Sequence, residues 1–330
     1  MKQQQGIQRG FTLIELLVVV TILGLLAVAV LPAFSAGGDK RLLRGAAERL
    51  DTHLKHAAAR ATGKSRGFAV WLDAGTGTAV FDLNFARLPT AASSQAKVTP
   101  RPNNRTAKVS PKITATQWSV IRFDMTPTGY QISSDESAPS GTSIITFADG
   151  YGYNEYNATF PNSPDRDIDY VVYEPPSAPL ITSRPTVMPD RVCVDLASST
   201  IGVDLFGDYE DGGSPELLST YDRLAICFDV YGKPNEIWGW SGSTPKRKTL
   251  TPGKPIALLC TLAYQSGKEQ VTDYSQITEA NPGAGWQNPD AFWVVIDPKT
   301  GRNLIVENGF EPGNVGEAQE FIVKDLLSQQ

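Results

Sequence analysis

The sequence feature that most constrains the fold is an apolar run at residues 11–34, in which Glu15 is the one charged residue. As an α-helix this run would be about 36 Å long, which exceeds the hydrocarbon thickness of a bilayer, about 30 Å. The run is therefore long enough to span a membrane. Lys2 and Arg9 precede it without any acidic residue. The positive-inside bias then places the N-terminus in the cytoplasm and the chain after residue 34 outside it.

The start of this run differs from that of an ordinary secretory signal. Such a signal has an apolar core of about 7 to 15 residues and small residues at a cleavage site on its far side. Here the core is longer, and the small residue, Gly10, lies on the near side between Arg9 and Phe11. Helix interiors disfavour glycine, so Gly10 marks a break at the cytoplasmic face.

Gly10 and the string F-T-L-I-E-L that follows it resemble the class III signal of type IV pilins and type II secretion pseudopilins, with Pro32 further along the run. The resemblance implies that a prepilin peptidase cleaves between Gly10 and Phe11 and methylates the amine of Phe11. It also implies that the apolar helix becomes the core of a filament. The matching residues cover about a tenth of the chain.

Glu15 needs a compensating charge, because a charged side chain in a bilayer costs about 2.5 to 3.5 kcal/mol on translocon scales. By the resemblance, cleavage makes Glu15 the fifth residue of the mature chain, where the N-methylated ammonium of a neighbouring subunit can pair with it. A buried charge without its partner costs about 3 to 5 kcal/mol. We therefore expect Glu15 to select the register of subunit assembly. The alternative is a plain signal anchor with its glutamate near the headgroups, which leaves the F-T-L-I-E-L string unexplained.

The pattern after the membrane predicts a second helical part. Pro32 should kink the helix, because proline removes one backbone hydrogen bond. Leucine and alanine then recur at intervals of three and four residues from Leu43 to Ala61, with the basic residues largely off this stripe, and Gly63 is a fitting stop. We predict a cytoplasmic leader at 1–10, a transmembrane and filament-core helix at 11–36, and an amphipathic continuation at 37–66.

Residues 67–330 predict a β-rich periplasmic domain, so the expected fold class is α+β, with a long helix packed on an antiparallel sheet as in pilins. A hairpin is predicted from strands at 68–73 and 78–83 around Gly75 and Gly77. Residues 87–112, rich in small and polar residues, are predicted to form a long exposed loop. Further strands are predicted at 118–123, 143–147, 168–173, 191–196, 224–230, 256–262, 292–297 and 303–306, and a helix at 316–327.

Three more fragments resemble the minor pseudopilin H and FimT-like group: residues 46–73, I-C-F-D-V-Y-G-K-P at 226–234, and V-V-I-D-P-K-T-G-R-N-L-I-V at 294–306. In that group the last two correspond to closing strands with their glycine turns. This chain is longer, and we place the extra residues in an insertion at about 84–189. Its size is closer to the tip pseudopilin of type K, but that type lacks the glutamate present here as Glu15, which favours an H-like subunit.

Charge and cysteine content narrow the chemistry of the exported part. Residues 39–66 hold eight basic and three acidic residues, whereas residues 67–330 hold 20 and 31. This acidic body disfavours nucleic acid as a partner. Cys193 and Cys227 each lie in a strand-like apolar stretch, which would allow one disulfide between adjacent strands. One disulfide would leave the third cysteine, Cys260, unpaired. The alternative, that the cysteines are buried structural residues, therefore fits the sequence equally well.

The histidines and acidic loops are weak candidates for metal binding. His53 and His56 are spaced to share a metal, but no carboxylate or cysteine completes a site nearby, so we expect packed or solvated helix residues. With no other histidine, a Ser/His/Asp triad is also hard to build. Calcium is known in a β-domain loop of the pseudopilin family, and two loops here are rich in oxygen ligands. Solvated acidic loops remain the favoured interpretation of both sets: Asp165, Asp167 and Asp169, and Asp204, Asp208, Glu210 and Asp211.

Two other motifs do not identify a functional site. Three tyrosines, Tyr151, Tyr153 and Tyr156, would suit either a contact surface or a loop packed on the sheet. The string G-T-G-T at residues 75–78 has neither the lysine nor the following helix that a phosphate-binding loop needs.

The expected function is that of a non-enzymatic minor pseudopilin, a structural subunit of the periplasmic pseudopilus of a type II protein secretion system. Its implied partners are other pseudopilins, the prepilin peptidase and the inner-membrane assembly platform, and no cofactor other than calcium is considered. The protein would insert in the bacterial inner membrane and then enter the pseudopilus. A minor type IV pilin for adhesion, motility or DNA uptake is the alternative. A third hypothesis is an exported, membrane-anchored enzyme or binding module in which the insertion is the active part.

Overall fold

The structure is a computed structural model, and it divides the chain into two compact units, residues 1–42 and 43–330. The described residues are 13–14, 16–24, 38–62, 67–75, 77–89, 92–100, 106–113, 119–124, 130–131, 141–146, 161–176, 180, 183–201, 222–241, 244–250, 255–268, 283–308, 317–318 and 321–322.

In the first unit, residues 13–14 and 16–24 are helical, and they lie inside the predicted membrane helix at 11–36. Their large apolar side chains are exposed, with exposed fractions between 46% for Val19 and 80% for Leu13. Within the part of the chain that the structure describes, no helix is both long enough and apolar enough to span a bilayer. Pro32, where a kink is predicted, lies outside the described residues.

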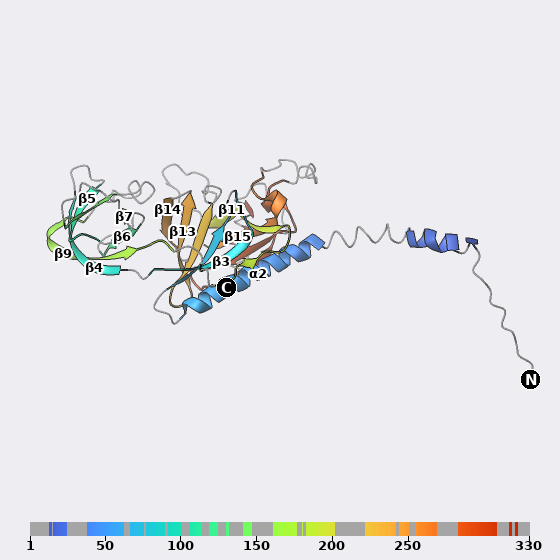
Figure 1. The fold of residues 1–330 in the computed structure, drawn as a ribbon, viewed down its shortest axis with the longest axis horizontal. Coiled ribbons are helices and arrows are strands. Elements are labelled where there is room, and N and C mark those ends of the chain that lie inside the picture. The colour runs from blue at the N-terminus through green and yellow to red at the C-terminus, as the bar shows by residue number, and fades with distance from the viewer. Residues whose placement is uncertain are drawn as a thin grey trace, which may run out of the picture. The chain divides into compact units, whose positions relative to one another are not determined.

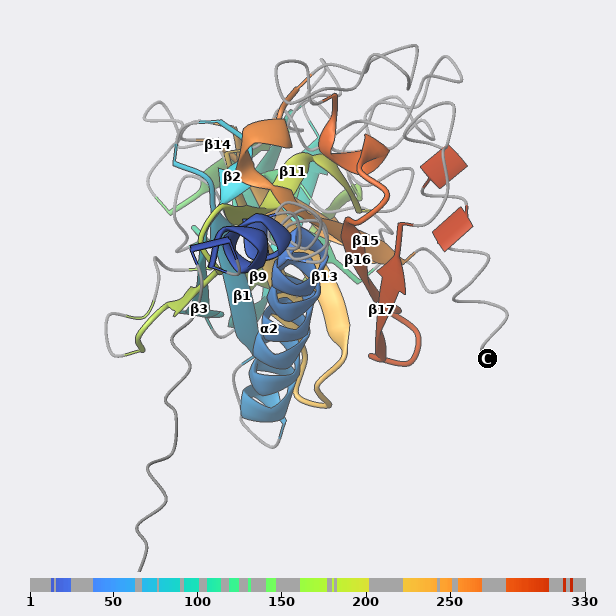
Figure 2. The same ribbon diagram turned by 90° about the vertical axis from the view of Figure 1, so that its right-hand side faces the viewer.

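The second helix, α2, is formed by Gly38–Ala61, inside the predicted range of 37–66 (Figure 1). Its residues from Leu43 onward bury one continuous apolar stripe, which consists of Leu43, Ala46, Ala47, Leu50, Leu54, Ala57 and Ala61. Four of these seven residues are alanines, so the helix backbone can lie close to the strands beneath it (Figure 2). Asp39 in the first turn and Arg60 in the last turn both suit the helix dipole.

The first sheet is antiparallel and lies against α2. Its strand order is β10 (Thr186–Val187), β3 (Asp82–Arg87), β1 (Phe68–Asp73), β12 (Arg223–Phe228), β13 (Pro234–Ser241) and β14 (Thr244–Thr249). One face of this sheet packs on the helix, where Phe85 of β3 contacts His53 of α2. The other face buries a tryptophan cluster of Trp71, Trp238 and Trp240, together with Val120 and Tyr173 from the third sheet.

The second sheet is also antiparallel, in the order β17 (Asn303–Glu307), β16 (Phe292–Ile296), β15 (Ile256–Leu262), β11 (Val192–Ile201) and β2 (Ala79–Val80). Every residue of β15 and β16 is buried, which explains why their sequences are continuously apolar. One core of this sheet includes Trp286, which belongs to the 3-10 turn η4 (Gly285–Gln287), and Ala318 and Ile322 near the C-terminus. A second 3-10 turn, η2 (Ala263–Gln265), follows β15.

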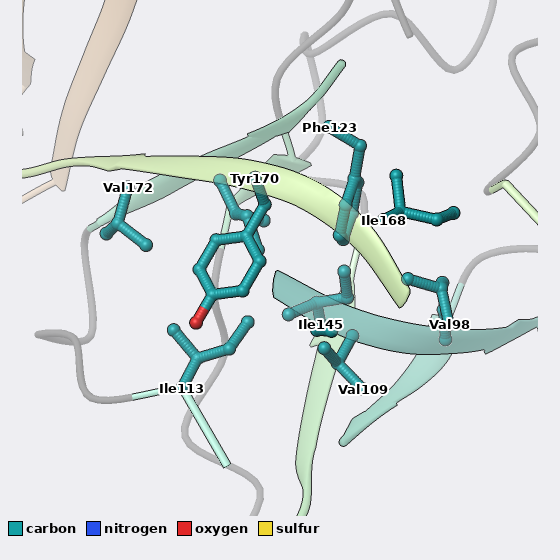
Figure 3. Close-up of a cluster of buried hydrophobic side chains, with 11 residues drawn as sticks. Val98, Val109, Ile113, Phe123, Ile145, Ile168, Tyr170 and Val172 are labelled. Carbon is teal, nitrogen blue, oxygen red and sulfur yellow. The ribbon is translucent and has the colours of Figure 1, made fainter. Parts of the chain in front are cut away.

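The third sheet is built within residues 92–173, which lie inside the predicted insertion at 84–189. Its antiparallel order is β7 (Tyr130–Gln131), β6 (Val120–Phe123), β9 (Ser163–Tyr173), β4 (Ala92–Pro100), β5 (Thr106–Ser110) and β8 (Ser143–Thr146). The outer strands β7 and β8 contact each other, so the sheet curls around its own core. In that core Phe123 and Tyr170 lie among aliphatic side chains (Figure 3). We call this part of the chain the inserted module.

Two of the secondary-structure predictions are wrong, and the first concerns the hairpin at residues 68–83. The predicted hairpin pairs 68–73 with 78–83, but β1 pairs with β3, placing Leu72 opposite Leu83. Val80, in β2, instead pairs with Val194 in the second sheet. Residues 78–83 and residues 82–87 both contain the apolar residues that a strand needs, so the local sequence could not choose the register.

The predicted exposed loop at 87–112 contains β4 and β5 instead. Their buried residues are small, Ala96 and Val98 on one strand and Ala107 and Val109 on the other. The large side chains that complete this core come from later strands. A prediction from the local sequence therefore could not identify β4 and β5. The other predicted strands all overlap strands of the structure.

Candidate assembly site

The residues predicted for processing and assembly, Gly10, Phe11 and Glu15, lie outside the described residues. Residues 13–14 and 16–24, on either side of Glu15, are helical, and their large apolar side chains are exposed. Thr21 is the one polar side chain in the described helix at 16–24, and its hydroxyl donates to the carbonyl of Leu17 at 2.8 Å. This bond satisfies the hydroxyl within the helix, as an apolar environment requires. The helix surface therefore offers a neighbour only apolar contacts.

His53 joins α2 to the first sheet. Its ring stacks on Phe85, with ring centroids 3.9 Å apart and planes inclined by 11°. Nδ1 lies 3.0 Å from the hydroxyl of Thr186, and Nε2 lies 3.2 Å from the carbonyl oxygen of Asn84. Burial lowers the pKa of His53 to about 4, although the bond to Asn84 acts in the opposite direction. The imidazole is therefore neutral at physiological pH and has a structural role.

Two arginines strengthen this joint. The Arg60 guanidinium lies 4.4 Å from the ring centroid of Phe85 and 5.7 Å from that of Phe68. Arg49 donates to the carbonyl of Val187 at 2.8 Å. These contacts hold the last turns of α2 on β1 and β3 and its middle on β10.

A shallow groove of about 400 Å³ runs beside this joint, lined by Gly45, Glu48, Arg49, Thr52, His53, His56 and Thr186. His56 is exposed, whereas His53 is packed. Among the residues that the structure describes, no three histidine, cysteine or carboxylate side chains gather as metal ligands would.

A buried carboxylate lies at the irregular part of β11. Asp195 is fully buried and accepts hydrogen bonds from Ser198 at 2.6 Å, Ser266 at 2.7 Å and the backbone N–H of Ala197 at 3.1 Å. Burial raises the pKa of Asp195, and these hydrogen bonds oppose the rise. An added Cβ on Gly285 would lie 2.8 Å from Cγ2 of Thr261 and 3.1 Å from Oδ2 of this carboxylate, so any other residue there would have to displace a side chain. The arrangement ties η2 and η4 to the second sheet.

A second buried charge lies between the first sheet and the inserted module. Glu236 on β13 is paired with Arg247 on β14 through Nε at 2.8 Å and through Nη2. Trp238 Nε1 donates to the same carboxylate at 3.3 Å. The guanidinium of Arg247 lies 3.8 Å from the ring centroid of Tyr173, the last residue of β9. The inserted module therefore contacts the first sheet through a cation–π interaction as well as through apolar packing.

The disulfide considered between Cys193 and Cys227 is absent. Cys193 and Cys227 are free and buried, and they lie on strands of different sheets. Cys260 is also free and buried. Burial raises the pKa of Cys193 to about 12 and raises that of Cys227 and Cys260 strongly. The alternative interpretation, buried structural cysteines, is the one that the structure supports.

One set of calcium candidates does not form a loop. Asp165, Asp167 and Asp169 lie on β9 and are exposed, and Asp169 accepts a hydrogen bond from Gln95 on β4 at 2.8 Å. Alternate residues of a strand share a face and are about 6.6 Å apart, so these carboxylates line a solvated face instead of converging. The other set (Asp204, Asp208, Glu210 and Asp211) lies outside the described residues, as do Tyr151, Tyr153 and Tyr156.

Comparison with known proteins bears on the N-terminal segment. Residues 6–31 match a family described as the prokaryotic N-terminal methylation motif. The matched residues include Gly10, Phe11 and Glu15, so the chain carries the signal of type IV pilin-like prepilins. No curated protein and no solved structure matches the chain.

Proposed function

We propose that this chain is a minor pseudopilin of H-like type, a non-enzymatic subunit of the periplasmic pseudopilus of a type II secretion system. The observation that carries the proposal is the methylation motif at residues 6–31. That motif supports assembly with other pilin-like subunits and processing by a prepilin peptidase. Cleavage after Gly10 would free the amine of Phe11, and the helix that begins there would enter the filament core.

The apolar helix at 16–24 supports the same proposal. Its exposed leucines and valines cannot remain in water without a cost of about 25 cal/mol per Å² of apolar surface. A bilayer covers them before assembly, and neighbouring helices cover them in a filament. The hydroxyl of Thr21 is already satisfied inside the helix, so neither environment leaves it unpaired.

The arrangement of the β domain supports an H-like subunit. Two of the three fragments that resemble this group, 226–234 and 294–306, lie in the hairpins β12–β13 and β16–β17. Their turns are adjacent, because a Cβ on Gly301 would lie 3.6 Å from the carbonyl oxygen of Gly232. The inserted module lies between β3 and β10 in the sequence, and the remaining strands form the first and second sheets, the first of which packs against α2.

The proposal is tested by replacing Glu15 with alanine in the full chain and measuring its incorporation into pseudopili and the secretion of exoproteins. We expect both to be lost while cleavage after Gly10 continues. Glu48→Ala is the matched control, because Glu48 is an exposed glutamate of α2 and its removal should leave assembly unchanged. Normal assembly of Glu15→Ala would contradict the proposed role of the carboxylate.

A deletion strain separates the two filament systems. We expect exoprotein secretion to stop while twitching motility and transformation continue. The opposite pattern would identify a minor type IV pilin.

A further inference from the structure

Two tight turns lie side by side at the C-terminal end of α2. They are residues 229–233, between β12 and β13, and residues 297–302, between β16 and β17, and we call them the twin-turn surface. A Cβ on Gly232 would lie 3.0 Å from the carbonyl oxygen of Ala58, so the first turn rests on the end of α2. A Cβ on Gly301 would lie 3.6 Å from the carbonyl oxygen of Gly232, so the second turn packs on the first.

The aspartates of the two turns are engaged by the backbone. Asp229 Oδ1 accepts from the N–H groups of Tyr231 and Lys233, each at 2.9 Å. Asp297 is buried, and its Oδ1 accepts from the N–H of Lys299 at 2.8 Å. These bonds hold both turns in one conformation, so a partner that binds here orders little additional chain.

The cations of the twin-turn surface have no counter-ion. Lys233, Lys299 and Arg302 are exposed, and none of the three forms an ion pair with the residues that the structure describes. The exposed lysine of α2, Lys55, is by contrast paired with Asp51 at 2.7 Å. Three unpaired positive charges on two rigid turns attract anionic groups.

An exposed tyrosine lies on the same turn as Lys233. Tyr231 is 79% exposed, and the neighbouring Val230 is 39% exposed. The backbone position of Tyr231 is fixed by its hydrogen bond to Asp229. A tyrosine on a fixed backbone offers a large, flat contact face at a low entropic cost. Such a face can stack on the flat apolar side of a sugar ring.

This combination suits an acidic glycan better than other anions. The cations are spread over two turns, which suits separate carboxylates along a polymer, and lysine and arginine bind carboxylates through charge-assisted hydrogen bonds. Duplex DNA carries one charge per about 1.7 Å of its axis. Residues 67–330, with 31 acidic and 20 basic residues, would repel so dense an anion. A glycan with sparser charge avoids most of this repulsion.

We propose that the twin-turn surface binds the glycan of the cell wall, peptidoglycan, in which uncharged sugar strands carry peptide stems with free carboxylates. The inference rests on the proposed function, which places residues 67–330 in the periplasm beside this polymer. The surface lies at the C-terminal end of α2, a helix of 24 residues and about 36 Å that follows the predicted membrane run. Each contact is small, and the many repeats of the polymer raise the overall affinity.

The test is co-sedimentation of the full chain, purified in detergent at low salt, with purified peptidoglycan sacculi. We expect saturable binding. Its affinity should fall on the order of tenfold in Tyr231→Ala and in Lys299→Glu/Arg302→Glu, the effect of removing one interface hot spot. Binding should also weaken at about 1 M salt, where the Debye length is about 3 Å.

Three other polymers identify what is recognised. Sacculi whose carboxylates have been converted to amides lack the charge, and chitin is an uncharged polymer of a related sugar, so both should bind more weakly than untreated sacculi. Equal binding to either would overturn the inference. Duplex DNA that binds as tightly as sacculi would also overturn it, because the site would then be a general one for polyanions.

The matched control variant is Tyr264→Ala/Lys268→Glu. Tyr264 is also a largely exposed tyrosine, at 52%, and Lys268 is an exposed lysine close to it in the sequence, on a different turn. This variant should bind sacculi as the unmodified chain does. Equal affinities of the control and of Lys299→Glu/Arg302→Glu, or no binding by the unmodified chain, would exclude the twin-turn surface as the site.

The mass of the N-terminus, measured in the same samples, distinguishes failure of the inference from failure of the proposed function. A chain that begins at a methylated Phe11 but does not bind sacculi overturns the twin-turn site alone. A chain that keeps its leader in cells that process their other prepilins, yet binds sacculi through Tyr231, overturns the pseudopilin assignment alone.

Discussion

The rings of His53 and Phe85 lie 3.9 Å apart in nearly parallel planes, so a titratable residue of α2 is packed in the joint between helix and sheet. Protonation there must bring a charge into an apolar contact that is buried.

The stability of the second unit should therefore depend on pH through His53. The pKa of His53 is about 4 in the folded chain, whereas the reference value, which describes the unfolded chain, is 6.5. Between these two pH values the unfolded state therefore binds a proton that the folded state does not. The free energy of unfolding should fall as the pH falls from about 6.5 to 4, by up to about 3 kcal/mol, and level off below 4. Chemical denaturation at several pH values measures it.

Two variants isolate this effect from the titration of carboxylates. His53→Ala should be less stable at pH 7 but should lose this part of the pH dependence. His56→Ala, on the exposed side of the same helix, should keep most of the pH dependence, because burial of His53 lowers its pKa more than the nearby His56 does. An unchanged slope in His53→Ala would show that other groups cause the pH dependence.

Breaking the pair of Glu236 and Arg247 should be costly. Both side chains are largely buried, and Arg247→Ala would leave the carboxylate with only Trp238 as a donor among the contacts described here. We expect a loss of about 3 to 5 kcal/mol in the free energy of unfolding. Arg44→Ala is the matched control, because the pair of Arg44 and Glu48 is exposed and should contribute little. Similar losses in both variants would contradict the buried environment of Glu236.

Gly232 should tolerate a side chain less well than Gly75, although both have positive φ angles, +77° and +63°. A Cβ at Gly232 meets the backbone of Ala58, whereas a Cβ at Gly75 meets no atom within 4 Å. Gly75→Ala should cost about 1 kcal/mol for its conformation alone. Gly232→Ala should cost more, because α2 or the turn must also move. Thermal melts of the two variants compare them directly, and equal shifts would exclude the close approach to α2.

The core of the inserted module can be weakened separately. Phe123 is fully buried in it, so Phe123→Ala should lose about 3 to 5 kcal/mol of local stability. Amide hydrogen exchange should then speed up in β4, β5 and β9 while α2 and β15 keep their protection. Arg122→Ala, an exposed neighbour on the same strand, is the control. Faster exchange throughout the second unit would show that the two cores unfold together.

The sequence predicted most reliably those features that depend on local patterns. The apolar stripe from Leu43 to Ala61 repeats every three or four residues and gives α2, and continuous apolar strands such as β15 need no context. The match at residues 6–31 agrees with the signal read around Gly10. Each of these signals lies within a short segment.

The errors came from features that depend on distant partners. Nothing local distinguishes Val80 paired with Val194 from Val80 in a hairpin. In the same way, β4 buries little more than alanine and valine, and it is a strand because β9 supplies the bulky Tyr170. The His53 joint could be suspected from a histidine on an apolar stripe, but Phe85 and Thr186 come from positions far along the chain. The turns at 229–233 and 297–302 have the sequences D-x-x-G-K and D-x-x-x-G-R, but only the fold reveals that they are adjacent.

Burial of the three cysteines also has a redox consequence. The thiolate is the form that attacks disulfides and is oxidised, and at neutral pH a thiol with a pKa of about 12, such as Cys193, ionises in about one molecule in 10⁵. Folded copies should therefore neither exchange with oxidoreductases nor become linked to one another through sulfur. Only a chain that has not yet closed its β domain exposes these groups, which makes alkylation of the thiols a direct measure of incomplete folding.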